Sequence, residues 1–173
     1  MSGLLIYIRE RDERMLLYLV TRRHVVLDRV MRAVTHLGDA AVTIGVVMLL
    51  LMSGIADFVT AGWLAAFMLV SSHALVQLLK RTIARPRPDL PVGAALAVAP
   101  DRFSFPSGHA ASSMSVALGA AGLLGGGLGG AVLVLAGLVG FSRCYLGVHY
   151  PGDVASGWAL ALTGFLLARM LGL

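Results

Sequence analysis

Charged residues are scarce in this sequence, and cysteine is almost absent. Only 13% of the 173 residues are charged, whereas a soluble globular domain has about a quarter. Hydrophobic residues make up 58% of the chain, more than one small core can bury. The single cysteine, Cys144, excludes an internal disulfide, and we expect it to be a small buried hydrophobic side chain. An ordinary soluble domain and a disulfide-stabilised fold are therefore both excluded.

The uncharged residues are concentrated in two long stretches. Residues 58–79 contain no formal charge over 22 positions, and residues 103–142 contain none over 40. Because a membrane-spanning helix needs about 20 apolar residues, the second stretch is long enough for two. The N-terminus is not a secretory signal, since six consecutive charged residues (9–14) stand where its apolar core should be. The pattern predicts a multi-pass integral protein of the cell membrane.

The predicted fold is an all-α membrane bundle of about five transmembrane helices. Proline and charge interrupt the apolar pattern between Lys80 and Phe105, which predicts a loop. The run Gly125–Gly130 predicts a tight turn, with close helix packing through its G-x-x-x-G spacing as the alternative. The expected spans are 37–54, 58–79, about 106–124, about 131–142, and a last one from 153 to the C-terminal end.

The N-terminal part of the chain differs from the rest. Apolar residues recur at helical spacing over 22–34, and arginine and aspartate occupy the positions between them. This is typical of an amphipathic helix that lies in the membrane interface. We therefore expect an N-terminal interfacial segment, 1–36, and a membrane-embedded domain, 37–173, with Asp39 as a helix cap at its start.

The net charge of +5 suggests anionic partners. No basic face interleaved with aromatic residues is present, so lipid headgroups or phosphorylated substrates are favoured over nucleic acid. With five spans, loops 80–105 and 142–153 open on the same membrane face as the N-terminal segment. That face holds 13 of the 14 lysines and arginines. The positive-inside rule would place it in the cytoplasm. Six of the 13 lie in these two loops, however, and can be present to bind substrate and not to set the orientation.

Two polar clusters border the loop 80–105. In KRTIARPRP, residues 80–88, cations precede rigid prolines. Lys80 and the planar guanidinium of Arg87 are suited to bind an oxyanion. The simpler alternative is that these cations only mark the end of a helix at the membrane surface. In FSFPSGHAASS, residues 103–113, Pro106 suits a first helical turn. Ser107 and Gly108 would then leave polarised N–H groups free for a phosphate, with His109 beside it.

The third cluster is SRCYLGVHYPGD, residues 142–153. Arg143 is another phosphate-binding candidate. His149 and Asp153 are four residues apart, so the carboxylate can accept the Nδ1 proton and leave Nε2 as a nucleophile. Together the clusters indicate phosphoryl transfer to water through a covalent histidine intermediate. His149 would attack phosphorus, and His109 would protonate the leaving alkoxide and then activate water.

These clusters resemble the three motifs of the type-2 phosphatidic acid phosphatase superfamily, which vanadium haloperoxidases share: K-x6-R-P, P-S-G-H and S-R-x5-H-x3-D. The resemblance covers the chain from about Thr35 to its C-terminal end. It implies that phosphate is bound and attacked without a metal ion or cofactor. Many membrane members have six spans, one more than predicted here. The residues it implies for phosphate binding are Lys80, Arg87, Ser107, Gly108, His109 and Arg143, with His149 as nucleophile and Asp153 orienting it.

We therefore expect a metal-independent lipid phosphatase that acts on the terminal phosphate of a lipid phosphate or diphosphate. Phosphatidic acid, phosphatidylglycerophosphate and a polyprenyl diphosphate such as undecaprenyl diphosphate all fit. A non-catalytic lipid-phosphate binding or transport protein that retains the site is the alternative. The apolar spans argue against a soluble haloperoxidase, and Cys144 lacks the arginine of a Cys-x5-Arg phosphatase. His73, within a span, is either a substrate contact or an interhelical hydrogen-bonding group.

Overall fold

The structure is a computed structural model that describes residues 3–91, 93–99 and 101–173. This part of the chain folds into seven α-helices and one short 3-10 turn, with no strand. The all-α prediction is therefore confirmed. The elements are α1 (Gly3–Thr21), α2 (Val25–Thr35), η1 (His36–Gly38), α3 (Ala40–Leu51), α4 (Ala56–Ile83), α5 (Gly108–Leu124), α6 (Gly126–Tyr145) and α7 (Pro151–Met170).

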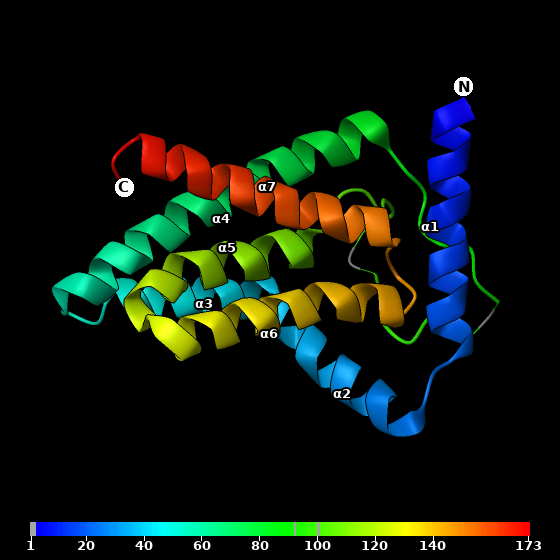
Figure 1. Cartoon of the computed structure of the whole chain (residues 1–173), viewed down its shortest axis with the longest axis horizontal. Coiled ribbons are helices and arrows are strands. Elements are labelled where there is room, and N and C mark those ends of the chain that lie inside the picture. The colour runs from blue at the N-terminus through cyan, green and yellow to red at the C-terminus, as the bar shows by residue number, and fades with distance from the viewer. Residues whose placement is uncertain (1–2, 92, 100) are drawn as a thin grey trace.

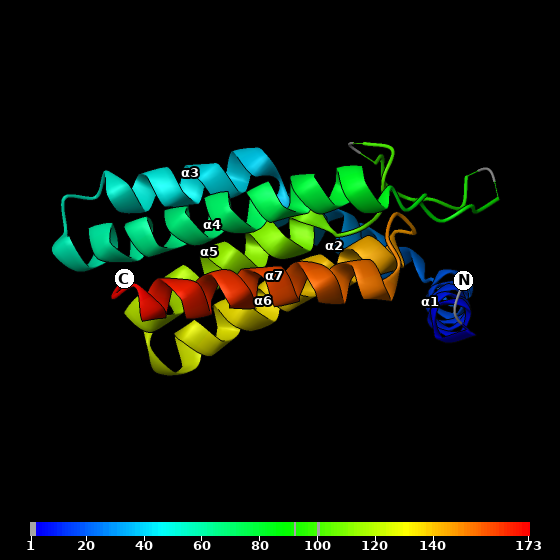
Figure 2. The same cartoon turned by 90° about the horizontal axis from the view of Figure 1, so that it is seen from above.

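Helix α5 is the axis of the bundle. It packs against α3, α4, α6 and α7, and Figure 2 shows it between α4 on one side and α6 and α7 on the other. The small side chains of α5 permit this close packing. The hydroxyl groups of Ser115 on α5 and Ser72 on α4 form a buried hydrogen bond, with 3.0 Å between the oxygens. Helix α1 lies across one end of the bundle, at a large angle to the other helices (Figure 1).

Helices α4 and α6 are long and apolar enough to cross a membrane. The α2–η1 segment and α3 together pass the same test as one span with a 53° bend. The chain therefore has at least two candidate spans, in keeping with a membrane protein. Helix α5 has 17 residues, slightly fewer than the roughly 20 that a full crossing requires.

Several helix boundaries differ from the expected ones. Helix α4 continues to Ile83 instead of ending near residue 79, so that Lys80 lies buried in its last turn. The helix ends where Ala84 adopts a left-handed conformation, with φ of 48°. Helix α1 was not predicted, because the charges of 9–14 were used only to exclude a signal peptide. They are compatible with a helix: Arg9 Nε donates to Glu13 Oε1 at 2.9 Å, one turn away.

A glycine turn between α5 and α6 is confirmed, but it is shorter than the expected 125–130, because α6 already begins at Gly126. Gly125 and Gly126 have φ angles of 60° and 38°, a conformation that only glycine adopts without strain. Close packing through Gly122 is wrong, because a Cβ there would have no neighbour within 4 Å. Close contacts lie instead at Gly129, where a Cβ would come within 2.5 Å of the carbonyl oxygen of Ala121 on α5, and at Gly119, where it would come within 2.7 Å of the Cβ of Ala65 on α4.

This packing generates a prediction for stability. Gly119→Val should lower the free energy of unfolding by about 1–3 kcal/mol, because the added side chain must separate α5 from the backbone of α4. Gly122→Val, on the same helix, should be neutral or stabilising, since it gains helix propensity in open space. Thermal unfolding of both variants in detergent measures the difference, and equal melting temperatures would contradict the packing argument.

Candidate active site

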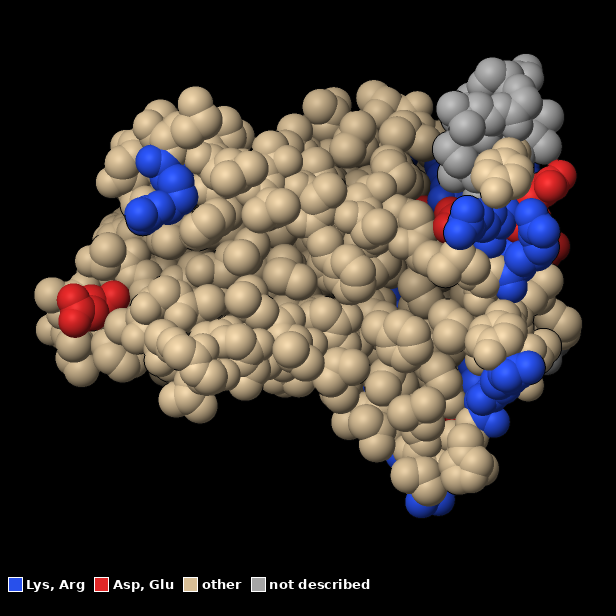
Figure 3. All heavy atoms as spheres, in the orientation of Figure 1, with Lys and Arg blue, Asp and Glu red and all other residues tan. Residues whose placement is uncertain are grey.

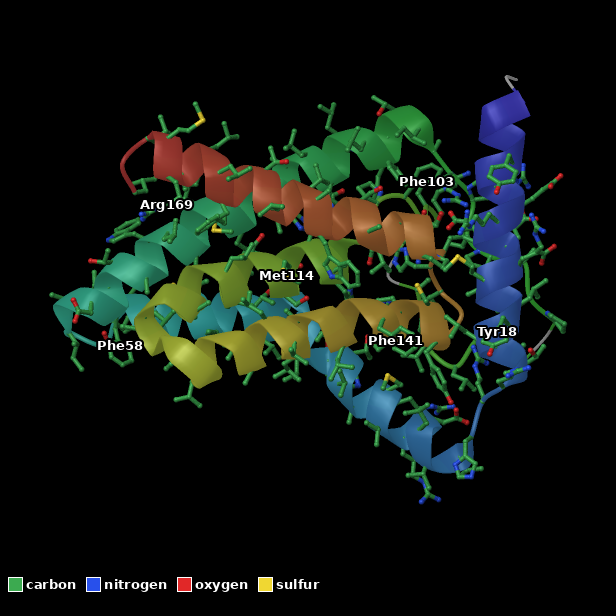
Figure 4. All side chains as sticks on the ribbon, viewed as in Figure 1. Tyr18, Phe58, Phe103, Met114, Phe141 and Arg169 are labelled. Carbon is green, nitrogen blue, oxygen red and sulfur yellow. The ribbon has the colours of Figure 1, made fainter. Side chains whose placement is uncertain are left out.

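The expected site residues converge at the end of the bundle that α1 crosses. Figure 3 shows lysine and arginine gathered at this end, with aspartate and glutamate among them, and an uncharged band over the middle of the molecule. Arg169, labelled in Figure 4, lies at the opposite end. Phe103, just before the P-S-G-H motif, lies at the α1 end (Figure 4). The loops therefore meet on one face, as their alternation along the chain predicted.

His149 and Asp153 form a buried pair. His149 lies in the short loop between α6 and α7, Asp153 lies in the first turn of α7, and both are almost completely inaccessible to solvent. Nδ1 of His149 is 3.5 Å from Oδ2 of Asp153, which is an ion-pair distance but too long for a well-formed hydrogen bond. Nδ1 has no hydrogen-bond partner within the described part of the chain. The same Oδ2 accepts the backbone N–H of Tyr150 at 2.9 Å. The carboxylate is thus fixed on the side of the ring that the sequence predicted.

The other ring nitrogen of His149 faces a cation. Nη1 of Arg87 lies 3.2 Å from Nε2 and also donates to the carbonyl of Val148 at 2.7 Å. Burial lowers the pKa of His149 to about 4; the nearby cations Arg87 and Arg143 act in the same direction, and Asp153 opposes them. A neutral ring with Nδ1–H directed at Asp153 leaves the Nε2 lone pair toward Arg87. A neutral imidazole nitrogen of this kind is what a nucleophilic role requires.

Lys80 and Arg87 are joined by the carboxylate of Asp101, which the sequence analysis did not single out. Asp101 accepts Lys80 Nζ at 2.5 Å through Oδ2 and Arg87 Nη2 at 2.9 Å through Oδ1. Its main-chain carbonyl also accepts Arg87 Nε at 2.7 Å. Partial burial raises the pKa of Asp101, but the hydrogen bonds and charges of the two cations outweigh it and hold the pKa below its usual value. An internal anion therefore contacts both proposed phosphate-binding cations.

His109 has a carboxylate partner as well. Its Nε2 is 2.9 Å from Oδ1 of Asp39, whose Oδ2 is 2.8 Å from Nδ1 of His36. The expectation that Asp39 caps α3 through its side chain is wrong, since it makes no capping hydrogen bond. Both of its oxygens are engaged by imidazoles instead. Gly38 permits the approach, because a Cβ there would come within 3.1 Å of the Cβ of His109.

The start of α5 differs from the expected phosphate-binding turn in one respect. The N–H of Ser107 was expected to be free, but it donates to the carbonyl of Asp153 at 3.0 Å. Helix α5 begins at Gly108, so the first N–H groups without an intrahelical partner belong to Gly108 and the residues after it. A Cβ at Gly108 would meet only Val76, at 3.9 Å. The glycine thus leaves the helix start open to an anion.

Arg143 has free donors in a buried position. Its Nη1 donates to Thr35 Oγ1 at 2.7 Å. Its Nε and Nη2 are buried and have no hydrogen-bond partner within the described part of the chain. Arg143 lines a cavity of about 390 Å³ together with His109 and Asp39. Buried guanidinium donors are costly when unpaired, and an oxyanion in this cavity would satisfy them.

Arg85 is a residue that sequence reasoning missed. Motif spacing singled out Arg87, but Arg85 Nη1 donates to Asp153 Oδ1 at 2.8 Å and forms a 2.9 Å ion pair with Asp12 of helix α1. Its guanidinium also stacks on the ring of Tyr150, 4.1 Å from the centroid. Asp12 in turn accepts the N–H of Gly152 at 2.8 Å. The repeated Arg-Pro of the loop was the only available signal, because Asp12 lies far away in sequence.

His73 is not part of the site. It is exposed on α4, and its Nε2 lies 3.1 Å from Gln77 Nε2 one turn away. The interhelical hydrogen bond expected as one alternative is therefore wrong, because the partner lies on the same helix. Across the described residues, no three His, Cys, Asp or Glu side chains are grouped so that they could hold a metal ion.

The electrostatics of His149 give a testable pH dependence. With its pKa near 4, the ring should stay neutral as pH falls from 7 to 5, where an ordinary histidine becomes protonated. NMR of ¹³C-labelled histidine in detergent, assigned with His149→Gln, measures this. Arg87→Met should move the titration to higher pH, because a neighbouring cation disfavours the imidazolium. A titration midpoint of His149 near pH 6.5 in the unmodified chain would contradict the conclusion that burial lowers its pKa.

Asp101 generates a second prediction. Asp101→Asn should tighten the binding of vanadate or inorganic phosphate roughly fivefold, equivalent to about 1 kcal/mol, because it removes an anion that competes for Lys80 and Arg87. Asp57→Asn, in the first turn of α4, is the matched control and should leave binding unchanged. Isothermal titration measures both. Weaker binding to Asp101→Asn would mean that the carboxylate positions the cations and does not compete with the ligand.

Comparison with known proteins supports the same region of the chain. Residues 61–171 match the family model described as the PAP2 superfamily. Over 139 residues the chain is 39% identical to a decaprenylphosphoryl-5-phosphoribose phosphatase of Mycobacterium tuberculosis, covering 76% of this chain and 73% of that protein. Over 175 residues it is 33% identical to phosphatidylglycerophosphatase B of Bacillus subtilis, covering 94% and 83%.

Solved structures show the same fold. A transmembrane PAP2 type phosphatidylglycerolphosphate phosphatase from Bacillus subtilis superimposes with a TM-score of 0.76 at 30% identity, covering 96% of this chain and 86% of that one. Aquifex aeolicus LpxE gives a TM-score of 0.74 at 24% identity, with 91% and 93% covered, and supports the fold alone. On the family match and these relatives, the chain belongs to the PAP2 superfamily of phosphatases.

Proposed function

We propose that this lipid phosphatase hydrolyses a terminal phosphate through a phosphohistidine at His149, without a metal ion. The observation that carries the proposal is the buried histidine whose Nδ1 faces Asp153 and whose Nε2 faces Arg87. A neutral, oriented imidazole beside a guanidinium supplies a lone pair for attack on phosphorus and a cation for the phosphoryl oxygens. Without substrate the lone pair faces Arg87 Nη1 at 3.2 Å, so attack would follow when Arg87 turns its N–H groups to the phosphate and frees Nε2.

In the first step, His149 Nε2 attacks phosphorus in line with the leaving oxygen. The N–P bond forms, the P–O bond to the lipid breaks, and the alkoxide takes a proton from His109. This requires His109 as the imidazolium. In the unliganded site burial and Arg143 oppose that form more strongly than Asp39 favours it, so His109 would take up its proton when the anionic phosphate binds beside it. Asp153 stabilises the positive charge that develops on His149, as a carboxylate does beside a catalytic imidazole.

In the second step, water replaces the histidine. His109, now neutral, takes a proton from water while the oxygen attacks phosphorus and the P–N bond breaks. Inorganic phosphate leaves, His149 regains its lone pair, and His109 is again protonated for the next cycle. Lys80, Arg87, Arg143, the N–H groups at the start of α5 from Gly108, and Ser107 beside them form the proposed phosphate cradle. Catalysis of this kind consists largely of positioning and charge stabilisation.

The substrate class follows from the relatives. Their names specify decaprenylphosphoryl-5-phosphoribose and phosphatidylglycerophosphate, two lipids whose headgroups end in a phosphate monoester. We propose a lipid of this general class here, with phosphatidic acid and polyprenyl diphosphates as related candidates that present the same terminal group. The phosphate would sit at headgroup depth, with α3–α7 embedded in the membrane, α1 at its interface, and the α2–η1 segment leading from the interface into α3.

Trapping the intermediate tests the mechanism. With an aryl phosphate, whose good leaving group needs no general acid, His109→Ala should still form phosphohistidine but hydrolyse it about 10²–10⁴-fold more slowly. Acid-labile ³²P should therefore accumulate on this variant in the presence of a chelator. His149→Ala should neither incorporate label nor release phosphate. Phosphate release that persists in His149→Ala would remove the proposed nucleophile, and binding without turnover by the unmodified chain would indicate a lipid-phosphate binding protein.

A further inference from the structure

Helix α1 places one carboxylate in the buried interior beside the site. The run 9–14 of this helix consists of six charged residues, and within this run only Asp12 is buried, with an exposed fraction of 7%. Helix α1 crosses the bundle next to the first turn of α7 (Figure 1). It precedes the residues 61–171 that match the family model, and Asp12 belongs to none of the three motifs.

Both oxygens of Asp12 are engaged. Oδ1 accepts the backbone N–H of Gly152 at 2.8 Å, and Oδ2 is 2.9 Å from Arg85 Nη1. A Cβ at Gly152 would come within 2.7 Å of Oδ2, so the glycine lets the carboxylate approach the start of α7. The first N–H groups of a helix favour a negative charge. Helix α1 therefore supplies this charge to α7 in the turn that carries Asp153.

Arg85 connects Asp12 to the carboxylate beside His149. Its Nη1 lies 2.9 Å from Asp12 Oδ2 and 2.8 Å from Asp153 Oδ1. The guanidinium stacks on the ring of Tyr150, 4.1 Å from its centroid, and this stacking holds the nitrogen between the two carboxylates. The other oxygen of Asp153 faces Nδ1 of His149 at 3.5 Å. The result is a row of groups in which the charges alternate: His149, Asp153, Arg85 and Asp12.

The net charge of this row changes when the proposed intermediate forms. With a neutral imidazole, two carboxylates and one guanidinium leave one net negative charge. Formation of the N–P bond makes the imidazole of His149 a cation, and the row becomes neutral. Without the carboxylate of Asp12, the row would start neutral and become positive. Because an uncompensated charge is costly in a buried site, the change that ends in a neutral row is favoured.

This electrostatic effect is specific to the reacting state. The neutral imidazole of the free site gives the charge of Asp12 little to act on, whereas the imidazole that is bonding to phosphorus carries a growing positive charge. An interaction that strengthens as the bond forms accelerates the chemical step and leaves the binding of substrate nearly unchanged.

We propose that Asp12 is a positioning residue for His149: through Arg85 and Asp153, its negative charge stabilises the cationic imidazole that forms during phosphoryl transfer. The proposal rests on the proposed function, because it requires His149 to become that cation. Asp12 acts on the substrate only through His149. Helix α1 thus contributes to the reaction in addition to covering the end of the bundle.

Two substitutions separate the charge of Asp12 from its shape. Asp12→Asn keeps the size and an oxygen for the N–H of Gly152 but removes the charge. Asp12→Glu keeps the charge but adds a methylene group where space is limited by Gly152. If charge is decisive, Asp12→Glu should retain more of the rate than Asp12→Asn. If Asp12 only anchors α1, the order should be reversed.

The rate to measure is that of phosphohistidine formation, in the His109→Ala chain on which the intermediate should accumulate. With saturating ³²P-labelled aryl phosphate, Asp12→Asn should slow the incorporation of acid-labile label roughly tenfold, the order of effect that one charge has at about 10 Å with an effective dielectric constant of about 20. The half-saturating substrate concentration and the Kd of inorganic phosphate should change less than about twofold. Rapid quenching and isothermal titration measure these quantities.

Glu10→Gln is the matched control, because it removes the same charge from an exposed position of α1 and should leave the rate unchanged. Thermal unfolding in detergent shows whether each variant is folded. If Asp12→Asn does not fold, Asp12→Ser removes the charge from a smaller side chain and carries the same expectation.

Three results would overturn the proposal: an unchanged rate in the folded neutral variant, a greater loss in Asp12→Glu than in Asp12→Asn, or a loss that appears as weaker phosphate binding. A failure of the proposed function looks different. In that case the His109→Ala chain accumulates no label even with Asp12 intact, or His149→Ala still releases phosphate.

Discussion

The buried carboxylate of Asp153 is the constraint on which the arrangement of the site depends. A carboxylate this far from solvent is tolerated only where cations and N–H donors satisfy it. Arg85 supplies the cation, and the backbone of Tyr150 supplies an N–H. Arg85 brings the loop after α4 to the start of α7, and its second partner, Asp12, brings α1 across the same end. The carbonyl of Asp153 also accepts Ser107, which fixes the start of α5. Four segments distant in sequence are therefore held together around the residue that orients His149.

The remaining charges at this end follow a second rule, which separates structural cations from binding cations. Arg85 has both of its carboxylate contacts in the buried interior of the fold. Lys80 and Arg87 share the partly exposed Asp101, which a more highly charged phosphate can rival. Arg143 has only a hydroxyl partner and keeps buried donors free. The cations thus range from fully compensated to uncompensated: Arg143, the least compensated, lines the cavity beside His109, and Arg87, which shares Asp101, contacts His149. An anion that carries two charges has most to gain at that point.

Sequence reasoning singled out the residues proposed to carry the chemistry and paired His149 with Asp153, but it missed the carboxylate partners of His109 and of Lys80 and Arg87. The intervals between Lys80 and Arg87, and between His149 and Asp153, are short and lie within one loop or one helical turn, so local geometry predicts them. Asp39 and Asp101 were out of reach, because an aspartate before a helix resembles a cap and one in a loop resembles a solvated charge. Each meets its partner only after distant helices pack. Likewise, Ser107 appeared to offer a free N–H because its acceptor, the carbonyl of Asp153, comes from another segment.

Helix α5 brings the proposed phosphate site and a close helix contact onto one element. Its first turn provides open N–H groups and places His109 at the site cavity. Another face carries Gly119, which lets α4 approach closely and bring Lys80 to the same end. A rotation of α5 by one residue, about 100°, would move both faces together. The small residues of α5 therefore do more than fill space, because they set how closely α4 can bring Lys80 to the start of α5.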